Sequence, residues 1–237
     1  MSQPQHSTPV GHDAEVQGTF DRIAAGYDTM NRLMTLNRHA AWCADVARRA
    51  TTVQGSDYLD LATGTGVIAR SVQARRPGSH VVGADFSEGM LDVARRQDPE
   101  SPITWEFADA HELPYGDESF DAITHGYLMR NVSDLDKVLG EQYRVLKPGG
   151  LVVALESSPP TGPLAPFVRI GMQAVIPTLG KVVAKDPEAY HYLTDSTLGF
   201  LPPKQLKDRF ERAGFTDVVY TPHFLRTNVI WQARKPR

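Results

Sequence analysis

Short apolar runs and longer amphipathic stretches alternate along the chain. The apolar runs have the length of buried strands and are bounded by turn-forming residues; they fall at residues 58–61, 81–85, 103–107, 120–124 and 151–155. Between them, apolar residues recur every three or four positions, which is the spacing of one helix face. Strands that alternate with helices form βαβ units. The pattern therefore predicts an α/β fold, a three-layer αβα sandwich with a mostly parallel sheet.

Two segments depart from this alternation. Residues 1–15 are polar, and we expect a flexible arm there, followed by helices over residues 19–50. Residues 156–200 are rich in Pro, Gly and aromatic residues, and we interpret them as an inserted lid. A helix over residues 203–213 and strands over 216–220 and 224–232 then restore the pattern. Residues 16–237 are thus expected to form one domain with an insertion.

The composition is that of an ordinary globular protein, with 41% hydrophobic and 22% charged residues and a net charge of −3. Three arginine pairs, at residues 48–49, 75–76 and 95–96, each end a helical segment, where cations complement the helix dipole. They do not form the concentrated basic face that binds duplex nucleic acid. We therefore expect no nucleic-acid partner.

Cys43 is the only cysteine, which excludes an intrachain disulfide and a cysteine-based zinc site. We expect no metal centre. The first residues lack the apolar core of a signal peptide, and no run of apolar residues is long enough to span a membrane. These features indicate a cytoplasmic protein.

The turn at residues 60–66 has the composition of a nucleotide-binding loop. Gly64 and Gly66 let a ligand approach the backbone, and the following helix offers free N–H groups. Asp85 closes the next strand and can accept hydrogen bonds from both ribose hydroxyls of an adenosine, whether in NAD or in S-adenosylmethionine (SAM). Asp109, after the third strand, can accept from an adenine amino group and is not part of the dinucleotide fingerprint. Together the three sites favour SAM. An NAD-dependent oxidoreductase and a non-catalytic nucleotide-binding module are the alternatives.

Longer motifs support this interpretation. Residues 60–66, 85–87, 109–114 and 146–150 resemble those of class I SAM-dependent methyltransferases. Residues 20–31, 130–132, 143–150, 180–184 and 190–196 more narrowly resemble the ubiquinone/menaquinone-biosynthesis C-methyltransferases, over about residues 16–220. The resemblance implies a Rossmann-like fold, SAM as cofactor, and methyl transfer to a ring carbon of a prenylated quinol such as demethylmenaquinol.

Carried over by position, the resemblance places the cofactor next to Thr65, Asp85, Asp109 and Ala110, with Gly126 close by, and the loop glycines Gly64 and Gly66 are further candidates. Tyr27, Asp28 and Asn31 of the N-terminal helices could close over the cofactor; capping and packing between these helices is an equally good explanation. Carbon methylation requires an electron-rich ring, so a group must favour the phenolate. Arg130 fits this role because it stays protonated, and Asn131 could orient a water. His125 is the candidate base. The alternatives are a structural ion pair for Arg130 and a polar core position for His125.

The predicted lid contains a mostly apolar helix over residues 167–176. Phe167 and Met172 could contact an isoprenoid tail, and Tyr127, Tyr190 and His191 could face the quinone ring. The helix could also lie on a membrane surface or simply pack on the core. Peripheral contact with the inner face of the membrane and assembly into a homodimer are both compatible with the sequence.

Three departures from the family pattern affect the acceptor. Val67 replaces an acidic residue, residues 127–129 read Tyr-Leu-Met, and residues 224–231 replace a glycine-rich stretch. Larger residues at these positions should alter the acceptor pocket. Methylation of a soluble aromatic metabolite, at carbon or at oxygen, is therefore the alternative function.

Overall fold

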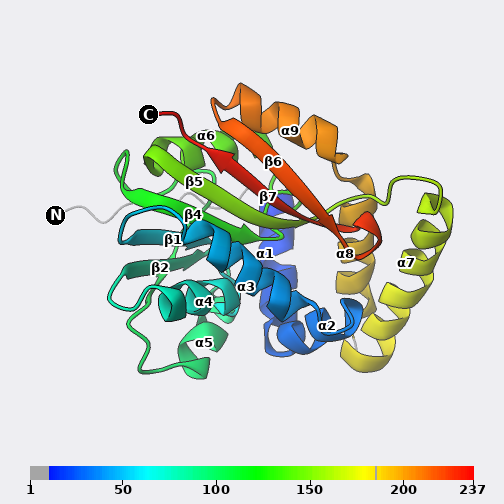
Figure 1. Cartoon of the computed structure of the whole chain (residues 1–237). Coiled ribbons are helices and arrows are strands. Elements are labelled where there is room, and N and C mark those ends of the chain that lie inside the picture. The colour runs from blue at the N-terminus through cyan, green and yellow to red at the C-terminus, as the bar shows by residue number, and fades with distance from the viewer. Residues whose placement is uncertain (1–10, 185) are drawn as a thin grey trace.

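The computed structural model describes residues 11–184 and 186–237. Within these residues, one sheet of seven strands forms the centre of the molecule, in the order β3-β2-β1-β4-β5-β7-β6 (Figure 1). The strands are β1 (Asp57–Leu61), β2 (His80–Asp85), β3 (Thr104–Phe107), β4 (Phe120–Gly126), β5 (Leu146–Ser157), β6 (Thr216–His223) and β7 (Asn228–Arg234). The first five are parallel, and β7 lies antiparallel to both β5 and β6. The predicted α/β fold is confirmed.

Helices cover both faces of the sheet, because each presents one apolar face. Apolar residues of α3 (His39–Ala50) and α4 (Val67–Arg75) pack on one face, and those of α6 (Leu135–Val145) and α9 (Pro203–Arg212) on the other. The helix α5 (Glu88–Gln97) packs beside β2 and β3. Strand order reverses at β1, with β2 on one side and β4 on the other. Ligands of such sheets bind at the carboxyl ends of the strands next to this reversal.

The N-terminal helices begin earlier than predicted. They are α1 (His12–Ile23), the short helix η1 (Ala24–Gly26) and α2 (Tyr27–Met34). Residues 1–10 of the predicted arm lie outside the described residues, whereas residues 12–15 are helical. The local sequence is polar, but α1 is held by tertiary contacts: Val16 is buried, and the Gln17 amide donates to the Phe86 carbonyl at 2.6 Å.

The segment between β5 and α9 contains two helices. These are α7 (Ala165–Leu179) and α8 (Pro187–Gly199), joined by the π-helical turn η2 (Gly180–Ala184). Figure 1 shows them side by side at one end of the molecule. Helix α8 buries apolar residues against α1 and α2, whereas α7 has no buried residue.

The strand predicted over residues 224–232 is shorter than expected. Residues Phe224–Arg226 form the turn η3, and β7 starts at Asn228. Phe224, Leu225 and Arg226 all have positive φ, which is incompatible with extended backbone.

Candidate active site

Asp60 anchors the loop that follows β1. Its Oδ2 accepts from the Thr63 hydroxyl at 2.6 Å and from the Ala69 N–H at 3.1 Å, and its Oδ1 accepts from the Thr124 hydroxyl at 2.7 Å. Burial raises the pKa of Asp60 to about 6. These bonds clamp both ends of the loop, so its backbone is held in place for a ligand.

The two predicted loop glycines have different roles. Gly64 has φ +56° and lines a pocket at the carboxyl ends of the strands. Gly66 has φ +83° but does not line this pocket, and a Cβ there would overlap the Trp105 ring. The prediction that Gly66 contacts the cofactor is therefore replaced by a packing role: the loop turns there and lies directly on Trp105.

Asp85 lies at the end of β2 and faces the same loop. Its Oδ2 accepts from the Gly64 N–H at 2.7 Å and its Oδ1 from the Ser87 N–H at 2.9 Å. The side chain is buried, and burial raises its pKa to about 6. Each carboxylate oxygen retains a lone pair after these bonds, so Asp85 can also accept from two ribose hydroxyls.

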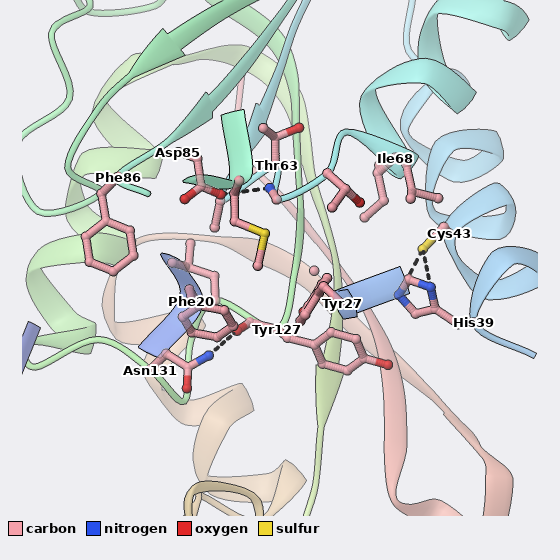
Figure 2. Close-up of a pocket in the computed structure, with 17 residues that line it drawn as sticks. Phe20, Tyr27, His39, Cys43, Thr63, Ile68, Asp85, Phe86, Tyr127 and Asn131 are labelled. Atoms are coloured by element: carbon pink, nitrogen blue, oxygen red, sulfur yellow. Dashed lines mark hydrogen bonds between the residues drawn. The ribbon is translucent and has the colours of Figure 1, made fainter. Parts of the chain in front are cut away.

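A narrow pocket of about 70 Å³ lies between this loop, β4 and the N-terminal helices. Figure 2 shows its labelled side chains, with Asp85 and Phe86 on one side and His39 and Cys43 on the other. The pocket is lined by Phe20, Tyr27, His39, Cys43, Ala62, Thr63, Gly64, Thr65, Val67, Ile68, Asp85, Phe86, Met90, Gly126, Tyr127, Leu128 and Asn131. We call it the cofactor pocket. Four predicted cofactor residues meet Asp85 here: Tyr27, Gly64, Thr65 and Gly126.

A second pocket of about 30 Å³ adjoins the first, because both are lined by Ala62, Phe86, Leu128 and Asn131. Asp109 and Ala110, the two remaining predicted cofactor residues, line this smaller pocket. The Asp109 carboxylate accepts from the His111 N–H at 2.8 Å and lies 2.8 Å from His111 Nδ1, and these contacts hold the pKa of Asp109 below its usual range.

The residues present fit SAM. Two carboxylates stand where an adenosine presents its ribose hydroxyls and its amino group, and Gly64 leaves the loop backbone accessible. The aromatic rings of Phe20, Tyr27 and Tyr127 line the cofactor pocket and can face a sulfonium cation.

Thr65 and the N-terminal helices are linked directly. The Thr65 hydroxyl donates to Asp28 Oδ1 of α2 at 2.7 Å. Asp28 Oδ2 in turn accepts from the Gln97 amide of α5 at 3.0 Å. Helix α2 is thereby fixed against the loop, and this contact places Tyr27 in the pocket wall.

Cys43 and His39 form an uncharged part of the pocket wall. The Cys43 Sγ lies 3.5 Å from His39 Nε2. Burial raises the pKa of the Cys43 thiol and lowers the pKa of His39. A neutral thiol is a poor nucleophile, so Cys43 contributes packing to the pocket.

Arg130 follows β4 and is paired with Glu156 at the end of β5. Its Nη1 donates to Glu156 Oε1 at 2.7 Å, and the two side chains are 5% and 0% exposed. Burial is the largest single influence and opposes the charged form, but Glu156, Tyr27 and Tyr127 together outweigh it and keep the pKa of Arg130 above its usual value. The guanidinium also lies 4.9 Å from the centre of the Tyr127 ring. Arg130 thus forms the predicted ion pair and lines a large cavity as well.

This large cavity has a volume of about 700 Å³ and is mainly apolar. Its wall includes the predicted residues Phe167 and Met172 of α7. Tyr27 and Tyr127 line both this cavity and the cofactor pocket, so the two spaces meet at these rings. We call it the acceptor cavity. Tyr127 has φ 59°, and this strained backbone is held by a hydrogen bond from its hydroxyl to Asn228 Oδ1 at 2.9 Å.

Asn131 does not lie at the acceptor cavity as predicted. Its Nδ2 donates to the Tyr127 carbonyl at 2.6 Å, as Figure 2 shows, and its Oδ1 accepts from the Tyr192 hydroxyl at 3.0 Å. Both ends of the amide are therefore used to join the segment after β4 to α8. Asn131 lines the cofactor pocket and the smaller pocket that adjoins it, so a role in orienting a catalytic water is not supported.

His125 lies outside all the pockets described above. It is fully buried within β4, and burial lowers its pKa to about 3. The buried Gln142 is its polar neighbour and favours the charged imidazole, but burial outweighs this contact. The prediction that His125 is the base is wrong, because its side chain has no access to the acceptor cavity.

Two predicted acceptor contacts on α8 also fail. Tyr190 is 1% exposed and packs against Gly180, and His191 is exposed; neither lines the acceptor cavity. Leu193 and Thr197 line it instead, one helical turn apart. The rotation of α8 about its axis decides this, and tertiary packing sets that rotation.

Glu156 was not predicted as a site residue, and Asn31 was considered only as a residue that closes over the cofactor. Glu156 follows the apolar run 151–155, and a carboxylate at the end of a buried strand is a detectable signal. Asn31 lines the acceptor cavity and not the cofactor pocket. No group of three His, Cys, Asp or Glu side chains suited to a metal occurs in residues 11–184 and 186–237.

Comparisons with known proteins agree with this geometry. Among solved structures, phosphoethanolamine N-methyltransferase 2 of Haemonchus contortus in complex with SAM superposes with a TM-score of 0.64 at 19% identity, over 83% of this chain and 53% of that one. A possible histamine N-methyltransferase from Thermotoga maritima gives 0.66 at 18% identity, over 93% and 99%. These likenesses show the predicted Rossmann-like fold.

Sequence relatives are closer. The chain is 43% identical over 213 residues to a ubiquinone/menaquinone biosynthesis C-methyltransferase of Desulfotalea psychrophila, covering 90% of this chain and 87% of that one. It is 41% identical over 200 residues to a demethylmenaquinone methyltransferase of Thermus thermophilus, covering 83% and 91%. The model of the ubiE/COQ5 methyltransferase family matches residues 8–232. The predicted resemblance and SAM as cofactor are confirmed, and the chain belongs to the ubiE/COQ5 methyltransferase family.

Proposed function

We propose that the protein is a SAM-dependent C-methyltransferase that methylates the ring of a prenylated quinol, with demethylmenaquinol as the acceptor. The observation that supports this proposal is that the cofactor pocket and the acceptor cavity lie next to each other and share lining residues. A narrow pocket that contains Asp85, next to a smaller one that contains Asp109, shares Tyr27 and Tyr127 with a large apolar cavity. An amphipathic ring with an isoprenoid tail matches this cavity, and the names of the relatives agree with it.

Different residues of the site bind the cofactor and activate the acceptor ring. SAM bound in the cofactor pocket supplies an electrophilic methyl group. Asp85 and Asp109 hold the nucleoside, and the aromatic rings exclude water from the junction. Arg130 keeps its positive charge next to the acceptor cavity and stabilises an ionised ring hydroxyl. Ionisation makes the neighbouring ring carbon electron-rich, and the fixed geometry aligns that carbon with the methyl group.

The test is a comparison of acceptors with and without a tail. Incubation with SAM and demethylmenaquinol should give a one-methyl mass gain on the ring, detected by mass spectrometry. Burial of the tail contributes about 25 cal/mol per Å², so a tailless naphthohydroquinone should have a lower kcat/KM. Lack of product with proven SAM binding would refute the proposal. Equal turnover of the tailless compound would support the soluble aromatic acceptor instead.

A pair of glycine variants sharpens this test. Gly171 lines the acceptor cavity, and a Cβ there meets nothing within 4 Å, so the backbone can accept the side chain of Gly171→Leu, which takes up space in the cavity. It should lower kcat/KM for the tailed acceptor roughly tenfold and leave the tailless one unchanged. Gly140 of α6 is equally open and lies outside the cavity. Gly140→Leu is the matched control for the helix change.

The mouth of the acceptor cavity supports a second part of the proposal, peripheral contact with a membrane. Phe167, Ile170 and Val182 are 74%, 64% and 70% exposed. Three segments that line this cavity, residues 27–36, 164–179 and 224–228, carry three Arg and one Asp. Each cation near an anionic surface contributes about 1 kcal/mol. No helix within residues 11–184 and 186–237 is long and apolar enough to cross a bilayer.

Vesicle binding tests this contact. The protein should sediment with vesicles that contain anionic phospholipid and much less with zwitterionic ones, and Ile170→Ser should weaken the binding. Val219 of β6 is 53% exposed, so Val219→Ser is the control. A homodimer that buries the α7 face would give the opposite result: a dimer in lipid-free sedimentation, converted to monomer by Ile170→Ser.

A further inference from the structure

His111 holds the Asp109 carboxylate by one of its two oxygens, in the smaller pocket next to the cofactor pocket. Two nitrogens of His111, the backbone N and the ring Nδ1, each lie 2.8 Å from Asp109 Oδ1. The other oxygen, Oδ2, accepts no hydrogen bond from the described part of the chain. Asp109 lines the pocket and its side chain is 27% exposed. Oδ2 is therefore the oxygen that remains for a donor of the ligand.

The tautomer of the His111 ring follows from the contact of its second nitrogen. Nε2 accepts from the backbone N–H of Asp134 at 3.3 Å, so it carries no proton in the neutral ring. The proton of the neutral imidazole is therefore on Nδ1, which donates to Asp109. A charged imidazole also has a proton on Nδ1. The contact with Asp109 is thus kept whether His111 is neutral or charged.

Two helices fix the His111 ring. Asp134 is the N-cap of α6, and Ser133 Oγ lies 3.3 Å from His111 Nε2. The Ser133 hydroxyl donates to Asp13 Oδ2 of α1 at 2.6 Å. Asp13 also lines the smaller pocket, and the His111 side chain is only 12% exposed. A ring that is held at both nitrogens keeps one rotamer, and it therefore also fixes the rotamer of the Asp109 carboxylate.

We propose that His111 is a positioning residue for the cofactor: it fixes Asp109 so that Oδ2 accepts from the amino group of the adenine ring. The inference rests on the cofactor half of the proposed function, in which Asp109 holds the nucleoside, and it does not depend on which acceptor is methylated. Ordering a free side chain at the moment of binding weakens affinity roughly two- to tenfold. Because His111 orders Asp109 before the ligand arrives, this loss is avoided. The arrangement selects adenine over a base with a carbonyl at the same position, since a carbonyl oxygen cannot donate to a carboxylate.

Two ligands that differ at one position of the base test this role by calorimetry. S-adenosylhomocysteine carries the adenine amino group, whereas its deaminated form, S-inosylhomocysteine, carries a carbonyl oxygen there. The wild-type protein should bind the adenine compound at least roughly tenfold more tightly, because the carbonyl gives Asp109 Oδ2 no donor. His111→Phe should weaken the adenine compound roughly two- to tenfold and change the deaminated one little, so the ratio falls. His111→Asn should restore the ratio, because its amide nitrogen can replace Nδ1 as the donor.

A double variant separates positioning from direct contact between His111 and the ligand. If His111 acts through Asp109, His111→Phe should have no further effect on S-adenosylhomocysteine affinity in an Asp109→Ala protein. The same loss in both backgrounds would overturn the proposal. His80 also lies beside an aspartate, Asp57, at 3.7 Å, but its side chain is 59% exposed and lines none of the pockets described above. His80→Phe is therefore the matched control and should leave both affinities unchanged.

The results separate the inference from the proposed function. Equal weakening of both ligands in His111→Phe would overturn the positioning role alone. Equal affinity of the wild-type protein for the two ligands would refute the assignment of adenine to Asp109, and the inference with it. Discrimination between the bases without quinol methylation would refute only the acceptor. Should the His111 variants fail to fold, nitrogen NMR of the wild-type protein still decides: the neutral His111 ring must carry its proton on Nδ1, and a proton on Nε2 would overturn the proposal.

Discussion

Removal of the Glu156 carboxylate should destabilise the protein strongly, because it leaves Arg130 charged and buried. Four hydrogen bonds reach this carboxylate, from Arg130 Nη1 at 2.7 Å, the Arg130 N–H at 3.3 Å, the Ser157 N–H at 2.7 Å and the Ser157 hydroxyl at 3.5 Å. Glu156 is 0% exposed, so water cannot replace them. Breaking a buried ion pair by removing one partner costs about 3–5 kcal/mol.

Thermal unfolding measures this loss. For a chain of this size, each kcal/mol lowers Tm by about 2–4 °C, so Glu156→Ala should lower Tm by roughly 6–20 °C. Glu211 pairs with Lys207 at 3.6 Å on the surface, and both side chains are about half exposed. Glu211→Ala is therefore the control and should cost less than about 1 kcal/mol.

A double variant distinguishes the buried charge from simple loss of packing. Glu156→Leu combined with Arg130→Met removes both charges and should recover most of the stability, since apolar replacements of buried pairs are often neutral. The double variant should remain inactive because Arg130 is gone. If Glu156→Ala has the same Tm as the Glu211→Ala control, the predicted cost of an unpaired buried charge is refuted. Arg130 must then have found another partner.

Three further predictions concern the cofactor side. Gly66→Ala should cost about 1–3 kcal/mol in urea unfolding and weaken SAM binding, because the added Cβ meets Trp105 at a positive φ; unchanged stability would contradict the packing role. The pKa of Asp85 is raised to about 6 by burial, so the acceptor form is present above this pH. SAM affinity, followed by calorimetry, should fall as the pH drops through about 6. Asp85→Asn should bind weakly and keep only the part of this dependence that comes from Asp60, whose pKa is also about 6. Tyr192→Phe removes the bond to Asn131 and should cost about 0.5–1.5 kcal/mol, with faster amide exchange in α8; exchange at the wild-type rate would show that the bond does not hold α8.

Local chemistry made much of the cofactor site predictable. Gly64, Asp85 and Asp109 each follow a strand whose apolar run is visible in the sequence, and parallel strands bring their carboxyl ends to one edge. Such positions need only the strand order, not the details of packing. The N-terminal arm was less predictable, because the contacts that hold residues 12–15 in a helix come from distant parts of the chain.

The acceptor side depends on rotations that a sequence does not display. His125 was assigned to the site because it is near a strand end, but the side chain at that position is buried within the sheet layers. Tyr190 and His191 share a helix with Leu193, yet only Leu193 faces the cavity. Glu156 was missed because its role depends on Arg130, which lies 26 residues away along the chain and is brought next to it only by the fold.

The place of β7 in the sheet has a consequence for synthesis. Strand β7 lies between β5 and β6, although it follows both along the chain. Until the ribosome has released it, the β5 edge, with its apolar residues 151–155, is unpaired and can associate with other nascent chains. The parallel half of the sheet can form during translation, but the seven-stranded layer closes only afterwards. Premature stops shortly before residue 228 should therefore yield insoluble protein even though all the residues of the cofactor pocket have been made.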